Sequence, residues 1–329
     1  MTDPTARGAA ILGIGAYRPR HNVSNEEICE QIDSTDEWIR TRTGILSRGW
    51  AGEDETLLDM AHAAAAEALA SAGLEPGALG MILVSTCTDS QSIQPVSARL
   101  AGRFGTELPA LEINATCAGF CYGIGLARDL VRGGTAETVL VVGAERLTDV
   151  TDPSDRGTAF IFADGAGAFV VGAANHDGIG PPVWGSDGGE RGDVLRLEPD
   201  WRAFSRDTTL RPPAIAMQGR RVFKWAVEHM PRAAEAACKA AGLTLADIDV
   251  LVPHQANQRI TDAIVRAMDL PERVVVADDI ATTGNTSSAS IPLAIHRLLA
   301  AGRVHHGDRA LLVGFGGGLS YAAQVVWLP

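Results

Sequence analysis

The chain has 329 residues, and its 28 lysines and arginines against 40 aspartates and glutamates leave a net charge of −12. Hydrophobic residues make up 46% and charged residues 21%, which is typical of a globular protein with one large or two modest domains. A nucleic-acid-binding protein would need a basic face, so the acidic total argues against that class. The length allows a core that needs no disulfides or metals for stability.

The five cysteines are an odd number without a CxxC pair or a zinc-ligand spacing, so we expect free thiols and no metal site. The opening residues MTDPTARGAA lack a basic segment followed by an apolar one, which argues against a secretory signal. No uninterrupted apolar run is long enough to span a bilayer. We therefore expect a cytoplasmic protein.

Short apolar runs alternate with helix-like segments along the chain. One helix is expected over Leu57–Ala72, because Thr56 and Asp59 give it a capping box, and another over Pro231–Ala241. This alternation predicts mostly parallel sheets with helices on both faces. The strands are expected, in chain order, over Ala9–Ile14, Met81–Ser85, Ala110–Ile113, Thr138–Val142, Ala168–Val171, Val250–Val252, Val274–Ala277, Ala310–Val313 and Ala323–Trp327.

Two stretches of the chain resemble each other across half its length. EALASAGLEPGALGMILV, with Gly73, matches EAACKAAGLTLADIDVLV, with Gly242, at an offset of 242 − 73 = 169. ETVLVVGAE, with Gly143, matches DRALLVGFG, with Gly314, at an offset of 314 − 143 = 171. Such a repeat indicates a duplicated α/β unit, and two stacked copies would make a layered sandwich. The two copies are expected to be residues 1–175 and 176–329.

One cysteine lies where a strand gives way to a helix. In EINATCAGFCYG the strand ends before Asn114, and a helix of small residues begins near Cys117. A helix N-terminus favours the thiolate form of a cysteine, and its free N–H groups can hold an oxyanion. A buried structural cysteine is the alternative, and Cys121, one turn further on, is expected to serve only packing.

The repeat makes two further residues, His254 and Asn285, stronger candidates for the functional site. His254 follows an apolar strand, where α/β folds place their ligands, and Asn285 lies in GNTSS, a small-residue loop that opens a helix. Either residue alone would more often be structural. Because 117 + 169 = 286, however, the GNTSS loop is the counterpart of the cysteine loop. Cys117, His254 and Asn285 can therefore converge across a pseudo-twofold axis.

The motifs NATCAGFCYG, VPHQANQRI, GNTSSASIPLA and GFGGG, together with STDEWIRTRTGI and DRGTAFIFADGAGA, resemble those of β-ketoacyl-acyl-carrier-protein synthase III. The resemblance covers nearly the whole chain, and the motifs occur in family order. It implies the duplicated thiolase-like fold, a five-layered αβαβα sandwich, in a homodimer. It also implies a decarboxylating condensation of a short acyl-CoA with malonyl-acyl carrier protein, which initiates fatty acid or aromatic polyketide synthesis.

The resemblance implies that Cys117 takes the acyl group, while His254 and Asn285 stabilise the enolate formed on decarboxylation. These roles are chemically coherent, since a thioester needs a soft nucleophile and decarboxylation needs hydrogen-bond donors rather than a strong base. By the same resemblance, the N–H groups of Cys117 and Gly317 form an oxyanion hole, and Phe315 walls the malonyl pocket. No cofactor is bound permanently, and coenzyme A enters only as the thioester substrate.

The resemblance also implies binding residues. Trp38 and Arg156 would sandwich the adenine of coenzyme A, and Arg42 would contact its phosphate region. Asn257 would position the pantetheine arm. The carrier protein would dock on Gln255, Ala256, Asn257, Gln258 and Arg259. Because carrier proteins are acidic, a basic face is expected to steer them, formed by Arg220, Arg221, Lys224, Arg259 and Arg266. A surface anchor, a loop ion pair or a solvated helix face is the structural alternative in each case.

One departure from the family concerns the choice of acyl starter. Gln94 stands just before Pro95, where the bacterial fatty-acid members usually have an aromatic or apolar gate. In the family's dimer this segment lines the partner's acyl pocket, so the identity of the starter stays open. The nearby polar residues are Asp89, Ser90 and Gln91. The polar segment Asp187–Pro213 has no clear period, and we expect an irregular excursion on the substrate side.

Other functions remain as alternatives. An acyltransferase of the same fold would move the acyl group to an amine, alcohol or thiol, and the polar residues near Gln94 are its only support. A Cys–His–Asn hydrolase fits the order Cys117, His254, Asn285 and the spacing 254 − 117 = 137, although CAGFC differs from the papain-like motif. A non-catalytic partner subunit is disfavoured because the nucleophile is present.

Overall fold

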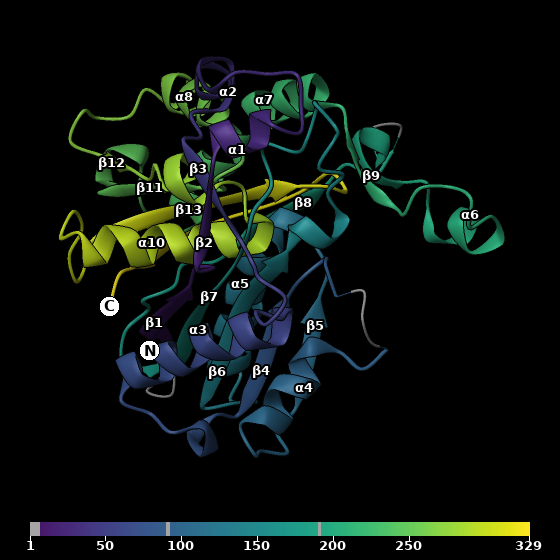
Figure 1. Ribbon diagram of the computed structural model, residues 1–329. Coiled ribbons are helices and arrows are strands. Elements are labelled where there is room, and N and C mark those ends of the chain that lie inside the picture. Colours follow the sequence, from purple (N-terminus) through teal and green to yellow (C-terminus); the bar gives the residue numbers. More distant parts are fainter. Residues whose placement is uncertain (1–6, 90–92, 190–191) are drawn as a thin grey trace.

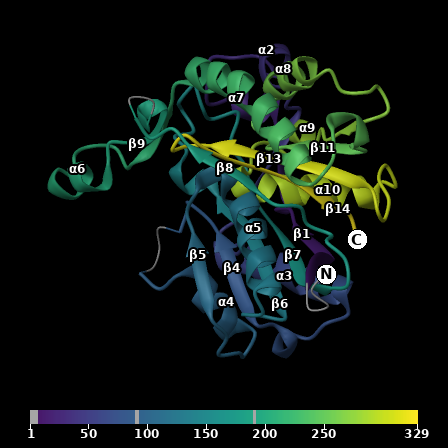
Figure 2. The same ribbon diagram turned by 180° about the vertical axis from the view of Figure 1, so that it is seen from behind.

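The computed structural model describes residues 7–89, 93–189 and 192–329. Its strands form two stacked five-stranded sheets, with helices between and outside them (Figure 1 and Figure 2). The first sheet has the order β1 (Gly8–Tyr17), β7 (Asp164–Ala174), β6 (Thr138–Arg146), β4 (Met81–Ser85) and β5 (Ala110–Ile113). The second has the order β8 (Val183–Ser186), β14 (Ser320–Trp327), β13 (Arg309–Gly316), β11 (Val250–Pro253) and β12 (Val275–Val276).

The two sheets have the same topology. In the first, β4 is parallel to β5 and β6, whereas β7 is antiparallel to β6 and β1. In the second, β11 is parallel to β12 and β13, whereas β14 is antiparallel to β13 and β8. The expected duplication is confirmed. The expectation of mostly parallel sheets is wrong, because β6 and β7, like β13 and β14, are joined without a crossover α-helix and run antiparallel.

The helices that pack on the sheets are α3 (Leu57–Ala72), α4 (Val96–Arg103), α5 (Gly119–Arg132), α7 (Gly219–Ala240), α8 (Gln258–Met268) and α10 (Ser290–Ala300). α3 and α4 cover the outer face of the first sheet, and α7 and α8 cover the outer face of the second. α5 and α10 lie between the sheets (Figure 1). The expected five-layered αβαβα sandwich is therefore confirmed.

The largest apolar core fills the central layer. α5 contributes Phe120 and Ile124, and α10 contributes Ile291 and Ile295, all of them buried. Phe120 meets Phe169 of β7 edge to face, with ring centroids 4.9 Å apart. Burial of each side chain of this size contributes about 1.5–3 kcal/mol, so this shared layer holds the two halves together.

Each central helix is preceded by a short 3-10 turn, here called its elbow: Thr116–Ala118 before α5 and Ser287–Ala289 before α10. The two glycines of the repeat lie against these elbows. A Cβ on Gly143 of β6 would lie 2.6 Å from the carbonyl oxygen of Ser288, and one on Gly314 of β13 would lie 3.1 Å from the Cα of Ala118. Only glycine allows so close an approach of backbone to backbone. Each sheet therefore makes room for the elbow of the other half.

Two additions lie outside the sandwich. The first, a cap above the second sheet, contains β2 (His21–Ser24), α1 (Asn25–Cys29), α2 (Asp36–Thr43), β3 (Ser47–Trp50) and α9 (Ile280–Thr283). The second, an arm that projects from the body, contains β9 (Leu195–Glu198), α6 (Trp201–Arg206) and β10 (Ala214–Met217) (Figure 1). The segment expected to be irregular over Asp187–Pro213 is thus partly ordered, because β9 pairs with β10 and α6 lies between them.

The start of one predicted helix is wrong. The spacing of apolar residues predicts a helix over Pro231–Ala241, but α7 begins at Gly219 and continues through Pro231 to Ala240. Trp225 and Met230 bury the added turns against the second sheet. The capping box expected before α3 is present. Within the described ranges, no helix is long and apolar enough to cross a bilayer.

The close approach at the elbows predicts that Gly143→Ala destabilises the protein. The new methyl group has to displace the carbonyl of Ser288, and overpacking of this kind costs about 1–3 kcal/mol. Gly102→Ala in α4 is the matched control, because its Cβ would meet nothing within 4 Å. Urea unfolding of both variants measures the difference. Equal stability of the two variants would show that the elbow is free to shift.

Candidate active site

Both elbows share an unusual backbone conformation. Thr116 has a φ of 46° and Ser287 a φ of 47°, a left-handed conformation that residues other than glycine rarely adopt. The shared strain marks the two turns as copies of each other. Their offset is 287 − 116 = 171, so the counterpart of Cys117 is Ser288, and the expectation that it is residue 286 is wrong.

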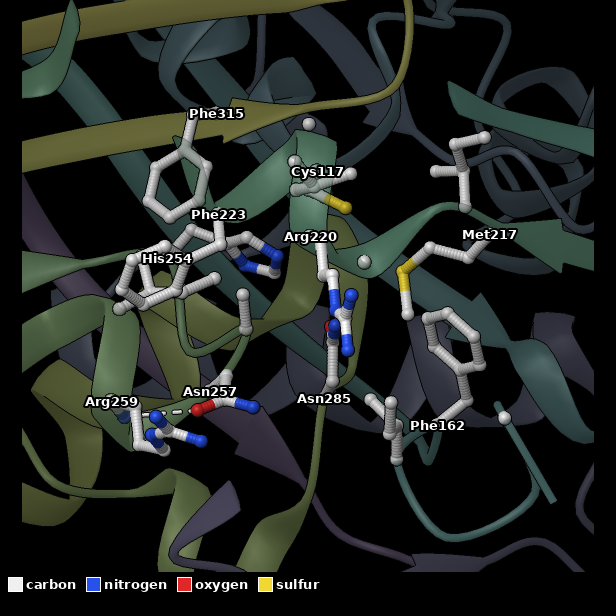
Figure 3. A pocket seen from close by; sticks show the side chains of 18 of the residues that line it. Cys117, Phe162, Met217, Arg220, Phe223, His254, Asn257, Arg259, Asn285 and Phe315 are labelled. Carbon is white, nitrogen blue, oxygen red and sulfur yellow. Dashed lines mark hydrogen bonds between the residues drawn. The ribbon is translucent and has the colours of Figure 1, made fainter. Parts of the chain in front are cut away.

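A cavity of about 630 Å³ reaches the first elbow. Cys117, His254 and Asn285 line it and point into the same space (Figure 3). His254 comes from the end of β11, and Asn285 comes from the loop before the second elbow. Phe315 and Gly317, at the end of β13, line the same cavity. The structure therefore brings together all the residues that the sequence assigned to the chemistry.

His254 is neutral and carries its proton toward the cavity. The residue is 2% exposed, and burial lowers the pKa of its imidazole to about 3. Nδ1 lies 2.7 Å from Ser290 Oγ, which also accepts the N–H of Gln255 at 3.3 Å. The serine hydroxyl then donates to Nδ1, and the ring proton is assigned to Nε2. His254 is therefore a hydrogen-bond donor, and Phe315 fixes its ring edge-on at 5.3 Å.

Asn285 is held by its backbone and presents an amide N–H₂ group. Its N–H donates to the carbonyl of Ile161 at 3.0 Å, and its own carbonyl accepts from Ala163 at 2.9 Å. Its side-chain Oδ1 accepts the N–H of Ser287 at 2.9 Å. With Oδ1 occupied, Nδ2 is the donor that Asn285 offers to the cavity.

The Cys117 thiol is protonated in the resting site. Burial raises its pKa to about 12, although the backbone N–H groups of Cys117 and Gly317 are directed at the sulphur and act in the opposite sense. The expectation of a thiolate is therefore wrong, because lost solvation outweighs the effect of the helix N-terminus on the Cys117 pKa. With His254 also neutral, the site lacks the thiolate–imidazolium pair that papain-like proteases use.

Gly317 is oriented by two hydroxyl groups. Its carbonyl accepts from Thr116 Oγ1 at 2.9 Å and from Ser320 Oγ at 2.9 Å, so that its N–H faces the sulphur of Cys117. The N–H of Cys117 points to the same place. Two convergent backbone donors beside a nucleophile are the arrangement that stabilises an oxyanion.

At the mouth of the cavity, Trp38 lies near two guanidinium groups. The Cζ atom of Arg156 is 5.3 Å from the centre of its ring, and that of Arg42 is 5.7 Å away. Phe160 meets the indole edge to face at 5.4 Å, and the buried Arg48 donates to the carbonyl of Phe160 at 3.0 Å. Arg48 therefore ties the segment that carries Arg156 to the cap. An indole flanked by guanidinium groups suits a flat aromatic ring that carries phosphates.

The segment after His254 begins α8. Asn257 caps this helix, since its Oδ1 accepts the N–H of Arg259 at 2.9 Å, and its Nδ2 donates to the carbonyl of Arg42 at 3.1 Å. Ala256, Asn257 and Arg259 line the cavity, whereas Gln258 donates to Asp262 on its own helix at 2.8 Å.

Gln255 lies inside the protein. It is 1% exposed, its Nε2 donates to the carbonyl of Pro253 at 2.8 Å, and its Oε1 accepts the N–H of Ile280 at 3.0 Å. The expectation that Gln255 belongs to a docking surface is wrong, because the side chain is fully used within the fold.

The basic residues of α7 point in different directions. Arg220 lines the large cavity, whereas Arg221 and Lys224 line a separate one of about 210 Å³. The expectation of one shared face is wrong, because Arg220 and Arg221 are separated by about 100° around the helix. Arg266 of α8 is exposed and does not line either cavity.

The segment expected to act as an acyl gate is described only in part. Asp89 pairs with Arg99 at 2.5 Å, and Gln94 is exposed. Ser90 and Gln91 lie outside the described residues. The arm, by contrast, contributes directly to the cavity, because Leu195 of β9 and Met217 of β10 both line it.

Sequence reasoning missed three residues behind the cavity. Ser290 orients His254, and Ser287 donates to the buried Glu145 at the end of β6. The repeat contained signals for all three. Both serines belong to the loop matched to the cysteine elbow, and Glu145 follows the first repeat glycine by two positions.

Comparison with known proteins identifies the family. The family profile described as 3-oxoacyl-[acyl-carrier-protein (ACP)] synthase III matches residues 111–188, and that of its C-terminal region matches residues 238–328. The chain is 50% identical to a β-ketoacyl-[acyl-carrier-protein] synthase III of Streptomyces glaucescens, with 98% of this chain and 96% of that protein covered. It is 47% identical to the mycobacterial enzyme of this name from Mycobacterium tuberculosis, with 100% and 98% covered.

Solved structures agree. The priming β-ketosynthase of the R1128 polyketide biosynthetic pathway superimposes with a TM-score of 0.96 at 46% identity, covering 100% of this chain and 98% of that one. The synthase III of Thermus thermophilus gives a TM-score of 0.88 at 40% identity, covering 97% and 99%. The chain therefore belongs to the β-ketoacyl-[acyl-carrier-protein] synthase III family, the acyltransferases that initiate fatty acid and polyketide synthesis.

Proposed function

We propose that the chain joins the acyl group of a short acyl-CoA to the malonyl group of malonyl-acyl carrier protein with loss of CO₂. The products are 3-oxoacyl carrier protein, coenzyme A and CO₂. The observation that carries this proposal is one cavity in which a buried thiol, a neutral imidazole and a side-chain amide converge. The thiol supplies a nucleophile, and the other two supply donors rather than a base.

In the first half-reaction, the sulphur of Cys117 attacks the thioester carbonyl of acyl-CoA. Negative charge develops on the carbonyl oxygen, and the N–H groups of Cys117 and Gly317 lie where they can stabilise it. Coenzyme A leaves, and the acyl group stays on Cys117. The guanidinium groups around Trp38 would hold the adenine and phosphates, while Asn257 would guide the pantetheine arm along the cavity.

In the second half-reaction, the malonyl thioester loses CO₂ and becomes an enolate. His254 Nε2–H and Asn285 Nδ2 would donate to the thioester oxygen, so that charge leaving the carboxylate is stabilised as it arrives there. Phe315 is 1% exposed and offers the departing carboxylate only an apolar wall. The carbanion then attacks the acyl-Cys117 thioester.

We also propose a homodimer formed along β5. This strand is the edge of the first sheet, and its Leu111 is 47% exposed. An open edge with an exposed apolar side chain is suited to pairing with a second copy of itself. The segment that holds Gln94 lies just before α4, beside this edge, and would then face the partner.

The remaining assignments follow from the same proposal. We infer a cytoplasmic enzyme without a resident cofactor, in which coenzyme A enters only as the acyl thioester. We also propose residues 1–175 and 176–329 as the two copies of the duplicated unit, which is supported by the end of β7 at Ala174 and the start of β8 at Val183. The carrier protein would approach the cavity mouth past Arg259, and Lys224 at the smaller cavity and the exposed Arg266 on α8 would add positive charge to this side of the protein.

The reaction predicts separable losses in two variants. Cys117→Ala should form no acyl-enzyme, whereas Asn285→Ala should acquire an acyl group from acyl-CoA but release CO₂ from malonyl-acyl carrier protein at least about 100-fold more slowly. Mass spectrometry of the intact protein after mixing with several acyl-CoAs measures the first step, and product analysis measures the second. Cys238→Ala, in the outer core, is the control and should retain both.

The same experiment separates the competing functions. Acyl transfer to an amine, alcohol or thiol without release of CO₂ would contradict condensation and support the acyltransferase of the same fold. Peptide cleavage that does not depend on coenzyme A would instead support the Cys–His–Asn hydrolase.

The neutral His254 predicts a pH dependence of stability. Its pKa is about 3 in the folded protein and about 6.5 in an unfolded chain, so between these values the unfolded chain binds one more proton. Proton uptake by His254 in the unfolded chain therefore lowers the free energy of unfolding as the pH falls from 6.5, by up to about 1.4 kcal/mol per pH unit. In urea unfolding from pH 7 to 4.5, His254→Asn should show a shallower loss, and the exposed His306→Asn should not. Parallel curves for His254→Asn and wild type would contradict the neutral assignment.

The docking assignment predicts an effect that depends on position along α7. Lys224→Glu should raise the KM for malonyl-acyl carrier protein several-fold at low salt, and the rate of acylation by acyl-CoA should stay unchanged. Lys239→Glu is the matched control, because it makes the same charge change on the same helix, about 22 Å further along. Steady-state kinetics at two salt concentrations measures both. Equal KM values for the two variants would remove Lys224 from the docking surface.

A further inference from the structure

The hydrogen-bond partner of His254 is the serine that begins α10. Ser290 is 1% exposed, and its Oγ lies 2.7 Å from Nδ1 of His254. The backbone N–H of Gln255 donates to the same oxygen at 3.3 Å. An N–H group offers no lone pair, so among the described residues Nδ1 is the acceptor that the hydroxyl hydrogen of Ser290 reaches.

Gln255 holds the serine oxygen from the other side. Its side-chain amide is anchored at both ends, because Nε2 donates to the carbonyl of Pro253 at 2.8 Å and Oε1 accepts the N–H of Ile280 at 3.0 Å. Its backbone N–H is thereby held against Ser290 and occupies a lone pair of Oγ. A hydrogen on Nδ1 of His254 would compete for that oxygen and leave the buried serine hydrogen without an acceptor, which is costly.

The first copy of the duplicated unit shows that the fold does not require this hydroxyl. The elbow offset of 287 − 116 = 171 places Gly119, the first residue of α5, at the position of Ser290, because 290 − 119 = 171. His254 corresponds to Ser85 at the repeat offset of 254 − 85 = 169. A Cβ on Gly119 would lie 2.0 Å from Ser85 Oγ, so the same helix start packs on the same strand end without a side chain. The hydroxyl of Ser290 therefore needs an explanation other than the elbow itself.

The direction of this hydrogen bond determines what the imidazole can do. In a Ser–His–Asp triad, the carboxylate accepts from Nδ1–H, so Nε2 carries no hydrogen and acts as a base. At His254 the polarity is reversed, because Ser290 donates to Nδ1 and leaves the hydrogen on Nε2. A donor at Nδ1 also draws electron density from the ring, which makes the Nε2–H group a stronger donor.

We propose that Ser290 is a positioning residue for decarboxylation, because it fixes the Nε2–H tautomer of His254 and makes this residue a donor to the thioester oxygen rather than a base. This proposal rests on the proposed function of His254 in the second half-reaction. The first half-reaction, in which Cys117 takes the acyl group, does not use this hydrogen bond. Loss of the hydroxyl is therefore expected to affect the two half-reactions unequally.

Two substitutions separate the hydroxyl from the rest of the side chain, since Ser290→Ala removes it and Ser290→Thr keeps it. Ser290→Ala should take up an acyl group from acyl-CoA within about twofold of the wild-type rate, but should release CO₂ from malonyl-acyl carrier protein about tenfold more slowly. Ser290→Thr should stay within about threefold of wild type in both steps, because its hydroxyl can donate to Nδ1. Mass spectrometry of the intact protein measures acylation, and product analysis measures release of CO₂.

Nitrogen NMR of the imidazole ring measures the tautomer directly. In protein made with isotope-labelled histidine, the signals of His254 are those that are absent from His254→Asn. They should show an unprotonated Nδ1 and a protonated Nε2 in wild type and in Ser290→Thr, whereas Ser290→Ala should gain the signal of a protonated Nδ1. A merely structural role would change the rates without changing which nitrogen carries the hydrogen.

Ser97→Ala is the matched control. Ser97 is a fully buried serine in the first turn of α4, and among the described residues its Oγ has no hydrogen-bond partner. The substitution removes a buried hydroxyl from a helix start on the other sheet. It should leave both half-reactions and the tautomer of His254 as in wild type.

The proposal is overturned if wild-type His254 carries its hydrogen on Nδ1, or if Ser290→Ala leaves the tautomer unchanged. It is also overturned if Ser290→Ala releases CO₂ at the wild-type rate or loses both half-reactions equally. If Ser290→Ala does not fold, Ser290→Gly takes its place, because Gly119 stands at this position in the first copy. If the wild type does not release CO₂ from malonyl-acyl carrier protein, the proposed function fails, and the spectra still decide whether Ser290 fixes the tautomer.

Discussion

The architecture depends on two elbows that rest on the sheet of the opposite half. The Cys117 elbow packs on Gly314 of β13, and the Ser287–Ala289 elbow packs on Gly143 of β6. Because these contacts are between backbone atoms at a strand without side-chain bulk, neither half can form its elbow surface alone. The active site is therefore a product of the interface between the halves, and the apolar central layer keeps that interface closed.

Burial then determines the charge of the site. Loss of solvation keeps the Cys117 thiol protonated and the His254 ring neutral, so neither of these two titratable residues of the cavity carries a charge. The buried carboxyl group of Glu145, behind the elbow, accepts hydrogen bonds from both halves, while burial raises its pKa.

Much of the fold could be predicted because it depends on patterns of neighbouring residues in the sequence. The repeat of Gly143 and Gly314 indicated the duplication, and the capping box before α3 marked a helix start. Sheet direction and the start of α7 were wrong, because antiparallel neighbours and a proline within a helix are decided by packing rather than by local preference. The sequence predicted an irregular arm. Its short strands β9 and β10 are stabilised by pairing with each other, and no local pattern shows that pairing.

The sequence by itself determined the duplicated α/β unit and the identity of the family, and it predicted that Cys117, His254 and Asn285 would converge. Only the tertiary structure decided how those residues behave. Solvation is lost when the halves close, which reverses the expected thiolate at Cys117 and buries Gln255, and no local pattern encodes that loss. Glu145 and Ser287 are adjacent because the second elbow packs on β6 of the other half, a contact between residues far apart in the sequence.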